Sequence, residues 1–150
     1  MSDNRPVKGD CMRFTYPISL TEDSIDGGFV VTCRDLPEVI TQGDSLEACF
    51  IEAADALDEA IHSRIKHGMD IPHSSKPEKG EHLVPVPVTT AMKAAIYLTT
   101  KGQKKVDLAT KWGVDEKEVR RVLDPKHPTK ASTLEHVLSR LGKRVEVLVN

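Results

Sequence analysis

The sequence predicts an α+β protein built from two parts of opposite charge. Residues 12–89 alternate short β-type segments with one long amphipathic helix, whereas residues 90–150 hold helical patterns and a Val-rich end. Residues 1–89 carry eight Lys or Arg against sixteen Asp or Glu (net −8), and residues 90–150 carry thirteen against seven (net +6). This asymmetry indicates two domains with different partners. We therefore expect a disordered tail at 1–11, an acidic domain at 12–89 and a basic domain at 90–150.

The acidic domain is expected to run strand, strand, strand, helix, strand. Its strand segments, rich in aromatic and β-branched residues, are 12–20, 29–33, 39–42 and 82–88. The helix opens with a capping box at Asp44 and Glu47 and ends at Gly68. Its apolar stripe predicts that it packs on one face of the sheet.

Residues 105–124 are the most informative part of the basic domain. Two short amphipathic patterns are joined by Gly113, which tolerates the left-handed backbone of a tight turn. Ala109 falls where two helices must cross closely, and Asp115 with Glu118 forms a capping box for the second helix. This register is typical of a DNA-reading helix-turn-helix, although an ordinary helical hairpin shares part of it.

Further helices are expected on both sides of this motif, at 91–101 and at 132–141. A capping box of Ser132 and Glu135 opens the second of them. Residues 144–150 alternate Val in a strand pattern and have no obvious partner within a helical domain. The strand either pairs with its copy in a second chain, which we favour, or folds back on its own helices. The expected dimerisation residues are Val145, Val147 and Val149.

Basic side chains on the outward face of the second helix are the candidate DNA contacts. Val119 and Val122 must face inward, which leaves the intervening basic residues free to reach base edges or phosphates. Lysines before and after this helix are better placed for phosphates, although any single one can be an ordinary solvated charge. The expected DNA-binding residues are Lys104, Lys105, Lys117, Arg120, Arg121, Lys126 and Lys130.

Several kinds of site are not indicated. The three cysteines are odd in number and lack metal-ligand spacing, so we expect reduced thiols in a cytoplasmic protein. His62 and His67 are five residues apart and do not share a helical face, which argues against a metal site. No segment approaches the ~18 apolar residues of a membrane span, and the polar start lacks a signal-peptide core. We expect no cofactor.

Short blocks in both halves carry a family signature. They are Asp-Gly-Gly-Phe-Val-Val at 26–31, Asp-Leu-Pro-Glu at 35–38, Thr-Gln-Gly-Asp-Ser at 41–45 leading into Glu47-Ala48 and Ala53, Thr129-Lys130, and Leu-Gly-Lys-Arg at 141–144. With the helix-turn-helix pattern, these blocks resemble the branch of the HicB antitoxin family that bears a C-terminal helix-turn-helix. The resemblance covers roughly residues 12–150. Glu38 departs from it, because many relatives carry Gly there.

The resemblance implies a partial RNase H-like fold for the acidic domain and DNA binding by the basic domain. It also implies a HicA toxin, a small basic mRNA interferase shaped like a double-stranded-RNA-binding domain, whose catalytic histidine the antitoxin covers. We therefore expect an antitoxin that neutralises this toxin and represses its own operon by binding promoter DNA. A homodimer or higher oligomer would form through the C-terminal domain, without membrane association.

Two other classes of function compete with this one. An RNase H-like nuclease holds two metal ions with several carboxylates, and one of these carboxylates lies inside the first strand. Residues 13–18 have no carboxylate. The protein is therefore expected not to be an enzyme. A one-component helix-turn-helix regulator with a small-molecule-sensing N-terminal domain stays as the alternative, although no phosphate-cradling Gly loop supports it.

A basic toxin calls for an acidic partner surface. The acidic residues fall in the turns and on the exposed face of the long helix, at Glu52, Asp55, Asp58 and Glu59. Carboxylates on a helix face are usually only solvated, so the turns and the adjoining sheet surface rank higher, and an acidic surface can also serve solubility alone. The expected toxin-binding residues are Glu22, Asp23, Asp26, Asp35 and Glu38.

Overall fold

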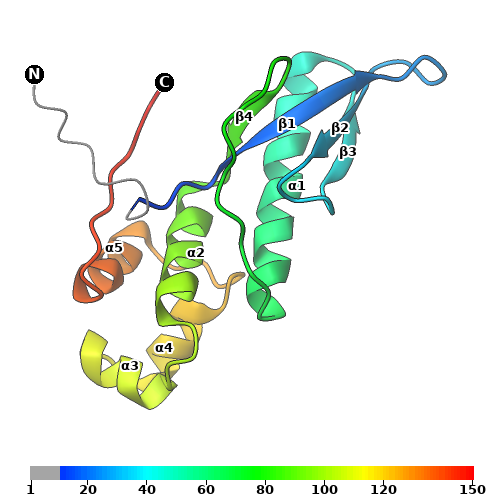
Figure 1. Ribbon diagram of the computed structural model, residues 1–150. Coiled ribbons are helices and arrows are strands. Elements are labelled where there is room, and N and C mark those ends of the chain that lie inside the picture. Colours follow the sequence, from blue (N-terminus) through cyan, green and yellow to red (C-terminus); the bar gives the residue numbers. More distant parts are fainter. Residues whose placement is uncertain (1–10) are drawn as a thin grey trace, which may run out of the picture.

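The computed structural model describes residues 11–150, and nearly all of the expected tail at 1–11 lies outside them. The elements in chain order are β1 (Thr15–Glu22), β2 (Phe29–Cys33), β3 (Ile40–Gly43), α1 (Leu46–Lys66), β4 (His82–Pro85), α2 (Val88–Thr100), α3 (Lys105–Trp112), α4 (Glu116–Leu123) and α5 (Ala131–Arg140) (Figure 1). This order confirms the expected α+β class and the strand, strand, strand, helix, strand arrangement of the first half. None of the helices in the described part is long and apolar enough to cross a membrane.

The four strands form one antiparallel sheet in the order β3-β2-β1-β4, and α1 packs across one face of it (Figure 1). Ile18 pairs with Cys33, and Val31 pairs with Thr41. Successive side chains of a strand alternate between the two faces, so every second residue points toward the helix. The buried residues of this layer include Tyr16, Ile18, Val31, Cys33 and Val84 from the sheet and Cys49, Ala53, Leu57 and Ile61 from α1.

The strand positions that point away from α1 carry no charged side chain. We call them the open sheet face. They are Thr15, Pro17, Ser19 and Thr21 on β1, Val30 and Thr32 on β2, Ile40 and Gln42 on β3, and Leu83 and Pro85 on β4. Ile40 is 70% exposed and Leu83 is 49% exposed. A sheet face that is uncharged and partly apolar is unusual in a chain of which 29% is charged, and it is a surface suited to contact with another protein.

Gly43 permits β3 to approach α1 closely. A Cβ atom at this position would lie 2.7 Å from the backbone nitrogen of Cys49 and 2.8 Å from its sulfur. The Cys49 thiol, which is fully buried, lies 3.5 Å from the Gly43 carbonyl oxygen. The glycine in this block of the sequence is therefore explained by packing between strand and helix.

Helix α2 contributes to both hydrophobic cores. Ala94 belongs to the core of the sheet and α1, whereas Met92 and Ile96 belong to a second core with α3, α4 and α5. The Tyr97 hydroxyl donates to the Met69 carbonyl at 2.8 Å, just after α1. The boundary proposed between residues 89 and 90 thus falls in the first turn of α2, and this helix joins the two halves.

Two capping predictions were wrong, the first by one residue and the second by two. Ser45, not Asp44, caps α1: its hydroxyl accepts the Ala48 N–H at 3.1 Å, and its own backbone is still extended. Helix α5 begins at Ala131 after Lys130, which makes no side-chain cap bond, so the capping box of Ser132 and Glu135 does not form. The Lys130 carbonyl already accepts from Leu134 at 3.1 Å, which places Ser132 inside the first turn.

The expected strands also differ from the structure: the first runs over Thr15–Glu22 and not 12–20, the fourth is shorter, and the terminal strand is absent from the described residues. The segment 82–88 is a strand only as far as Pro85, because the Pro87 carbonyl accepts the N–H of Ala91 at 3.0 Å and starts α2. No strand forms within residues 144–150, since a strand needs a hydrogen-bonding neighbour and the described residues, 11–150, offer none there. Val145 packs against the second core, whereas Val147 and Val149 are 68% and 86% exposed.

Candidate nucleic-acid interface and partner surface

Helices α3 and α4 are joined by the expected tight turn. Gly113 has φ 70° and ψ 35°, the left-handed conformation, and its N–H approaches the carbonyls of Ala109 and Thr110. A Cβ atom there would meet only Arg140 Nη2 at 3.8 Å, so the backbone conformation, not space, requires Gly. Asp115 accepts the N–H of residue 118 at 2.8 Å, which confirms it as the N-cap of α4.

Helix α4 presents its basic residues to solvent. Val119 is 0% exposed and Val122 is 1% exposed, in the core that also holds Trp112. Lys117, which precedes them, and Arg120 and Arg121, which lie between them, are exposed, as expected. Within the described part of the chain, the two arginines make surface ion pairs inside the helix, 3.4 Å from Glu116 and 3.6 Å from Glu118 respectively. Such pairs contribute little, so both guanidinium groups can turn to a phosphate or a base at small cost.

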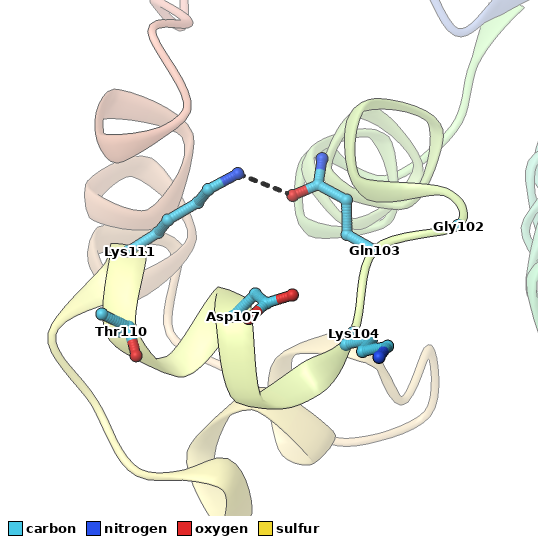
Figure 2. Close-up of a pocket in the computed structure, with 6 residues that line it drawn as sticks. All are labelled: Gly102, Gln103, Lys104, Asp107, Thr110 and Lys111. Atoms are coloured by element: carbon cyan, nitrogen blue, oxygen red, sulfur yellow. Dashed lines mark hydrogen bonds between the residues drawn. The ribbon is translucent and has the colours of Figure 1, made fainter.

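An open hollow of about 590 Å³ lies at the start of α3 (Figure 2). Lys104 and Lys111 line it, together with Gln103, Thr110 and Asp107. The Lys111 ammonium donates to the Gln103 amide oxygen at 3.0 Å, above the first turn of the helix (Figure 2). The hollow thus holds two ammonium groups against the one carboxylate of Asp107, beside the positive end of a helix, so its net positive charge favours a phosphate.

Of the remaining predicted DNA-binding lysines, one contacts the acidic half of the chain. Lys105 and Lys130 are exposed. Lys126 instead approaches Glu59 of α1, with Nζ 3.5 Å from Oε1, although both side chains are mostly exposed. This is a surface ion pair like those of Arg120 and Arg121, so the Lys126 ammonium can also turn to a phosphate at small cost.

Lys93 is a functional candidate that the sequence reasoning missed. It lies on α2 and is only 5% exposed. Its ammonium donates to the carbonyls of Asp124 at 2.6 Å, His127 at 2.7 Å and Arg121 at 3.3 Å. Burial lowers the pKa of Lys93, and the Asp124 carboxylate partly offsets that shift. The signal available in the sequence was a lone Lys inside the otherwise apolar run from Ala91 to Ile96.

Two of the predicted toxin-binding carboxylates have partners inside the chain. Asp35 accepts the Ser75 N–H at 2.8 Å and the Ser75 hydroxyl at 2.6 Å. Glu38 accepts two hydrogen bonds from Arg64 of α1, and these lower the pKa of Glu38. Both residues hold the turn after β2 against neighbouring segments, which leaves them less available to a partner.

The turn between β1 and β2 is the acidic turn that stays open. Asp23 accepts the N–H groups of Ile25 at 3.0 Å and Asp26 at 3.1 Å, and these bonds lower the pKa of Asp23. The carboxylates of Glu22 and Asp26 are exposed and have no side-chain partner in the described part of the chain. Ile25 is 90% exposed beside them. We call residues 22–28 the hairpin tip.

On the acidic face of α1, one carboxylate has a partner within the chain and others face solvent. Asp58 accepts from the Thr90 hydroxyl at 2.5 Å and lies 3.2 Å from His62, so it holds α1 to the start of α2. Glu52 and Asp55 point to solvent. Among residues 11–150, no group of three or more His, Cys, Asp or Glu side chains is arranged to hold a metal ion.

Comparison with known proteins identifies the family. A family described as "HicB_like antitoxin of bacterial toxin-antitoxin system" matches residues 15–95. The chain is 32% identical to Antitoxin HicB 1 of Photorhabdus laumondii, over 89% of this chain and 86% of that protein. It is 29% identical to Antitoxin HicB of Pseudomonas fluorescens, over 93% and 95% of the two chains. Antitoxin HicB of Escherichia coli K12 is 28% identical, over 89% and 98%.

These matches show the class of protein: it is an antitoxin of a toxin–antitoxin system and not an enzyme. The chain belongs to the HicB-like antitoxin family. This confirms the resemblance drawn from the sequence blocks.

Proposed function

We propose that this antitoxin neutralises a HicA-type mRNA interferase with its acidic half and represses its own operon with its basic half. The observation that carries the proposal is the separation of two unlike surfaces on one chain. The open sheet face is uncharged and the hairpin tip is acidic, whereas α4 presents Lys117, Arg120 and Arg121. Each surface fits a different partner, and neither is arranged for bond-making chemistry.

The proposed toxin surface combines the open sheet face with the hairpin tip. A toxin that grips RNA is basic, so the exposed carboxylates of Glu22 and Asp26 would speed its association. Ile25, Ile40 and Leu83 are exposed on the same surface and supply the apolar contact that holds a complex. Covering the toxin's active site would then exclude RNA. The three antiparallel strands followed by α1 support a partial RNase H-like fold for this half.

The proposed operator surface is a helix-turn-helix formed by α3 and α4. Helix α4 is the reading helix, because its inward face is buried and its outward face is basic. Lys104 and Lys111 at the hollow beside α3 would contact phosphates. One such motif reads one half-site, so a dimer is needed, and we propose that residues 144–150 supply it by pairing with the same segment of a second chain.

We place the protein in the cytoplasm, and two assays test its two roles. The gene beside this one should encode a short basic toxin, and growth of cells that express both genes tests neutralisation. Binding of the purified chain to its own promoter, compared with a scrambled duplex of equal length, tests repression. Growth arrest despite soluble antitoxin would remove the first role, and equal affinity for both duplexes would remove the second.

A further inference from the structure

The C-terminal end of α4 is held by a side chain from another helix. The last carbonyl groups of any α-helix lack partners within the helix. Here the Arg121 carbonyl, in the last turn of α4, and the Asp124 carbonyl, at its C-cap, both accept from Lys93 of α2. The His127 carbonyl, in the loop that follows, is the third acceptor.

The contact suits the chemistry of an ammonium group. An ammonium has three N–H donors and no acceptor, and the three carbonyls match them one for one. Its positive charge also lies where the negative end of a helix dipole favours a cation. Because Lys93 is 5% exposed, it is not available to contact DNA itself.

Lys93 also lies at the junction of the two halves. It lines a cavity of about 210 Å³ together with Asp58 and His62 of α1 and His127 of the loop after α4. Thr90, one helical turn before Lys93, donates to Asp58 at 2.5 Å. One short stretch of α2 therefore holds both α1 and the end of the proposed reading helix.

We propose that Lys93 is a positioning residue that fixes α4 in its DNA-reading orientation and thereby sets operator affinity without touching DNA. The inference rests on the proposed operator binding. Without the ammonium, the Arg121 carbonyl at the end of α4 loses its tie to α2. The Asp124 and His127 carbonyls keep the N–H groups of His127 at 3.2 Å and Thr129 at 2.8 Å, which lie in the same loop and do not hold it to α2. The end of α4 and the loop 124–127 can then shift relative to α2. A reading helix that samples several orientations loses conformational entropy when it binds DNA, and this loss weakens the affinity.

The salt dependence of operator binding separates this role from direct contact. Each phosphate contact contributes about −0.9 to the slope of log affinity against log salt concentration. We compare the full chain with three variants: Lys93→Met, which keeps the length of the side chain, Lys104→Met, which removes a proposed phosphate contact, and Lys101→Met. Lys101 is an exposed control at the end of α2, where its ammonium pairs with Asp70 at 2.7 Å.

The inference predicts that Lys93→Met weakens promoter binding at least tenfold while the slope stays unchanged. Lys104→Met should make the slope shallower by about 0.9 for each copy, or about 1.8 for a dimer on both half-sites, and Lys101→Met should bind as the unaltered chain does. Affinity of Lys93→Met within twofold of the unaltered chain would overturn the inference. A shallower slope for Lys93→Met would also overturn it, because Lys93 would then itself reach a phosphate.

A second measurement uses the unaltered protein, and it decides the matter if Lys93→Met fails to fold. Nitrogen-15 NMR should show one lysine ammonium whose protons exchange slowly with water, and it should be absent from Lys93→Arg. An ammonium signal that exchanges as fast as those of exposed lysines would overturn the capping contact. If the unaltered chain does not bind its promoter but shows the protected signal, the operator proposal fails while the contact stands.

Discussion

The guanidinium of Arg64 on α1 holds both carboxylate oxygens of Glu38, in the turn between β2 and β3. Its Nε donates to Oε2 at 2.6 Å and its Nη2 donates to Oε1 at 2.9 Å. The third nitrogen, Nη1, donates to the Asp70 carbonyl at 2.8 Å. One arginine therefore joins the turn of the sheet to the helix and to the segment beyond it. The carboxylate that the sequence assigned to a toxin partner has a structural role in the isolated chain.

The Arg64 pair should make stability depend on pH. The pair lowers the pKa of Glu38 below its usual 4.5, so its contribution is fully present above pH 4.5 and is lost as pH falls through the lower, folded-state pKa. Since the Glu38 side chain is 39% exposed, solvent screening limits the effect, and Glu38→Gln should cost about 1 kcal/mol at pH 7.

Urea unfolding at pH 7 and pH 3 measures this difference. Glu52→Gln, on the exposed face of α1, serves as the control and should change little at either pH. Equal stability of Glu38→Gln and the unaltered chain at pH 7 would show that the pair contributes nothing. Retained toxin neutralisation by Glu38→Gln would support its assignment to the fold.

The turn between α3 and α4 should tolerate only residues that adopt a left-handed backbone. Gly113→Ala has room for its Cβ atom, so its cost is conformational and should be about 1 kcal/mol. Gly113→Asn should cost less, because Asn enters this region more readily. Thermal unfolding of both variants checks the order. An Ala variant as stable as the unaltered chain would mean that the turn is not under this constraint.

The outward arginines of α4 should determine which DNA sequence is bound. Arg120→Ala or Arg121→Ala should weaken operator binding by roughly 1–3 kcal/mol and relax base preference at one position of each half-site. Lys66→Ala, at the end of α1, is the matched loss of a distant positive charge. Binding to a panel of single-base operator variants measures both effects. Unaltered affinity and preference in both arginine variants would remove α4 from the reading role.

Much of this architecture followed from local patterns in the sequence. Local features depend on residues only a few positions apart, so the sequence shows them directly. Examples are the apolar stripe of α1, the turn at Gly113 and the N-cap Asp115. The partners of Asp35 and Glu38 lie 40 and 26 residues away, and no local pattern reveals such contacts. Lys93 was missed for the same reason, because its acceptors are backbone carbonyls, which carry no residue type to recognise.

The predicted terminal strand failed for a different reason. Val147 and Val149 have the alternation of a strand, but a strand forms only when a neighbour supplies hydrogen bonds. We therefore expect the full chain to be a dimer by light scattering and a chain lacking residues 144–150 to be a monomer. The shortened chain should also bind a single half-site more weakly than the full chain binds the operator. A shortened chain that stays dimeric would rule this segment out as the interface.

Two double variants test whether the toxin binds the open sheet face and the hairpin tip. Ile40→Lys with Asp26→Lys places positive charge on the open sheet face and the hairpin tip, against a basic toxin. Ile51→Lys with Asp55→Lys makes the same changes on the exposed face of α1, outside the proposed surface, and Ile51 is 58% exposed. Circular dichroism should first show that both full-length variants are folded.

The most direct test is the growth of cells that co-express the neighbouring toxin gene with each full-length antitoxin variant. We predict that the unaltered chain, the α1 variant and Arg120→Ala with Arg121→Ala all restore growth. The variant of the open sheet face and hairpin tip should leave cells arrested, although it still binds the promoter. Restored growth with that folded variant, or arrest with the arginine variant, would contradict the assignment of toxin and DNA to separate surfaces.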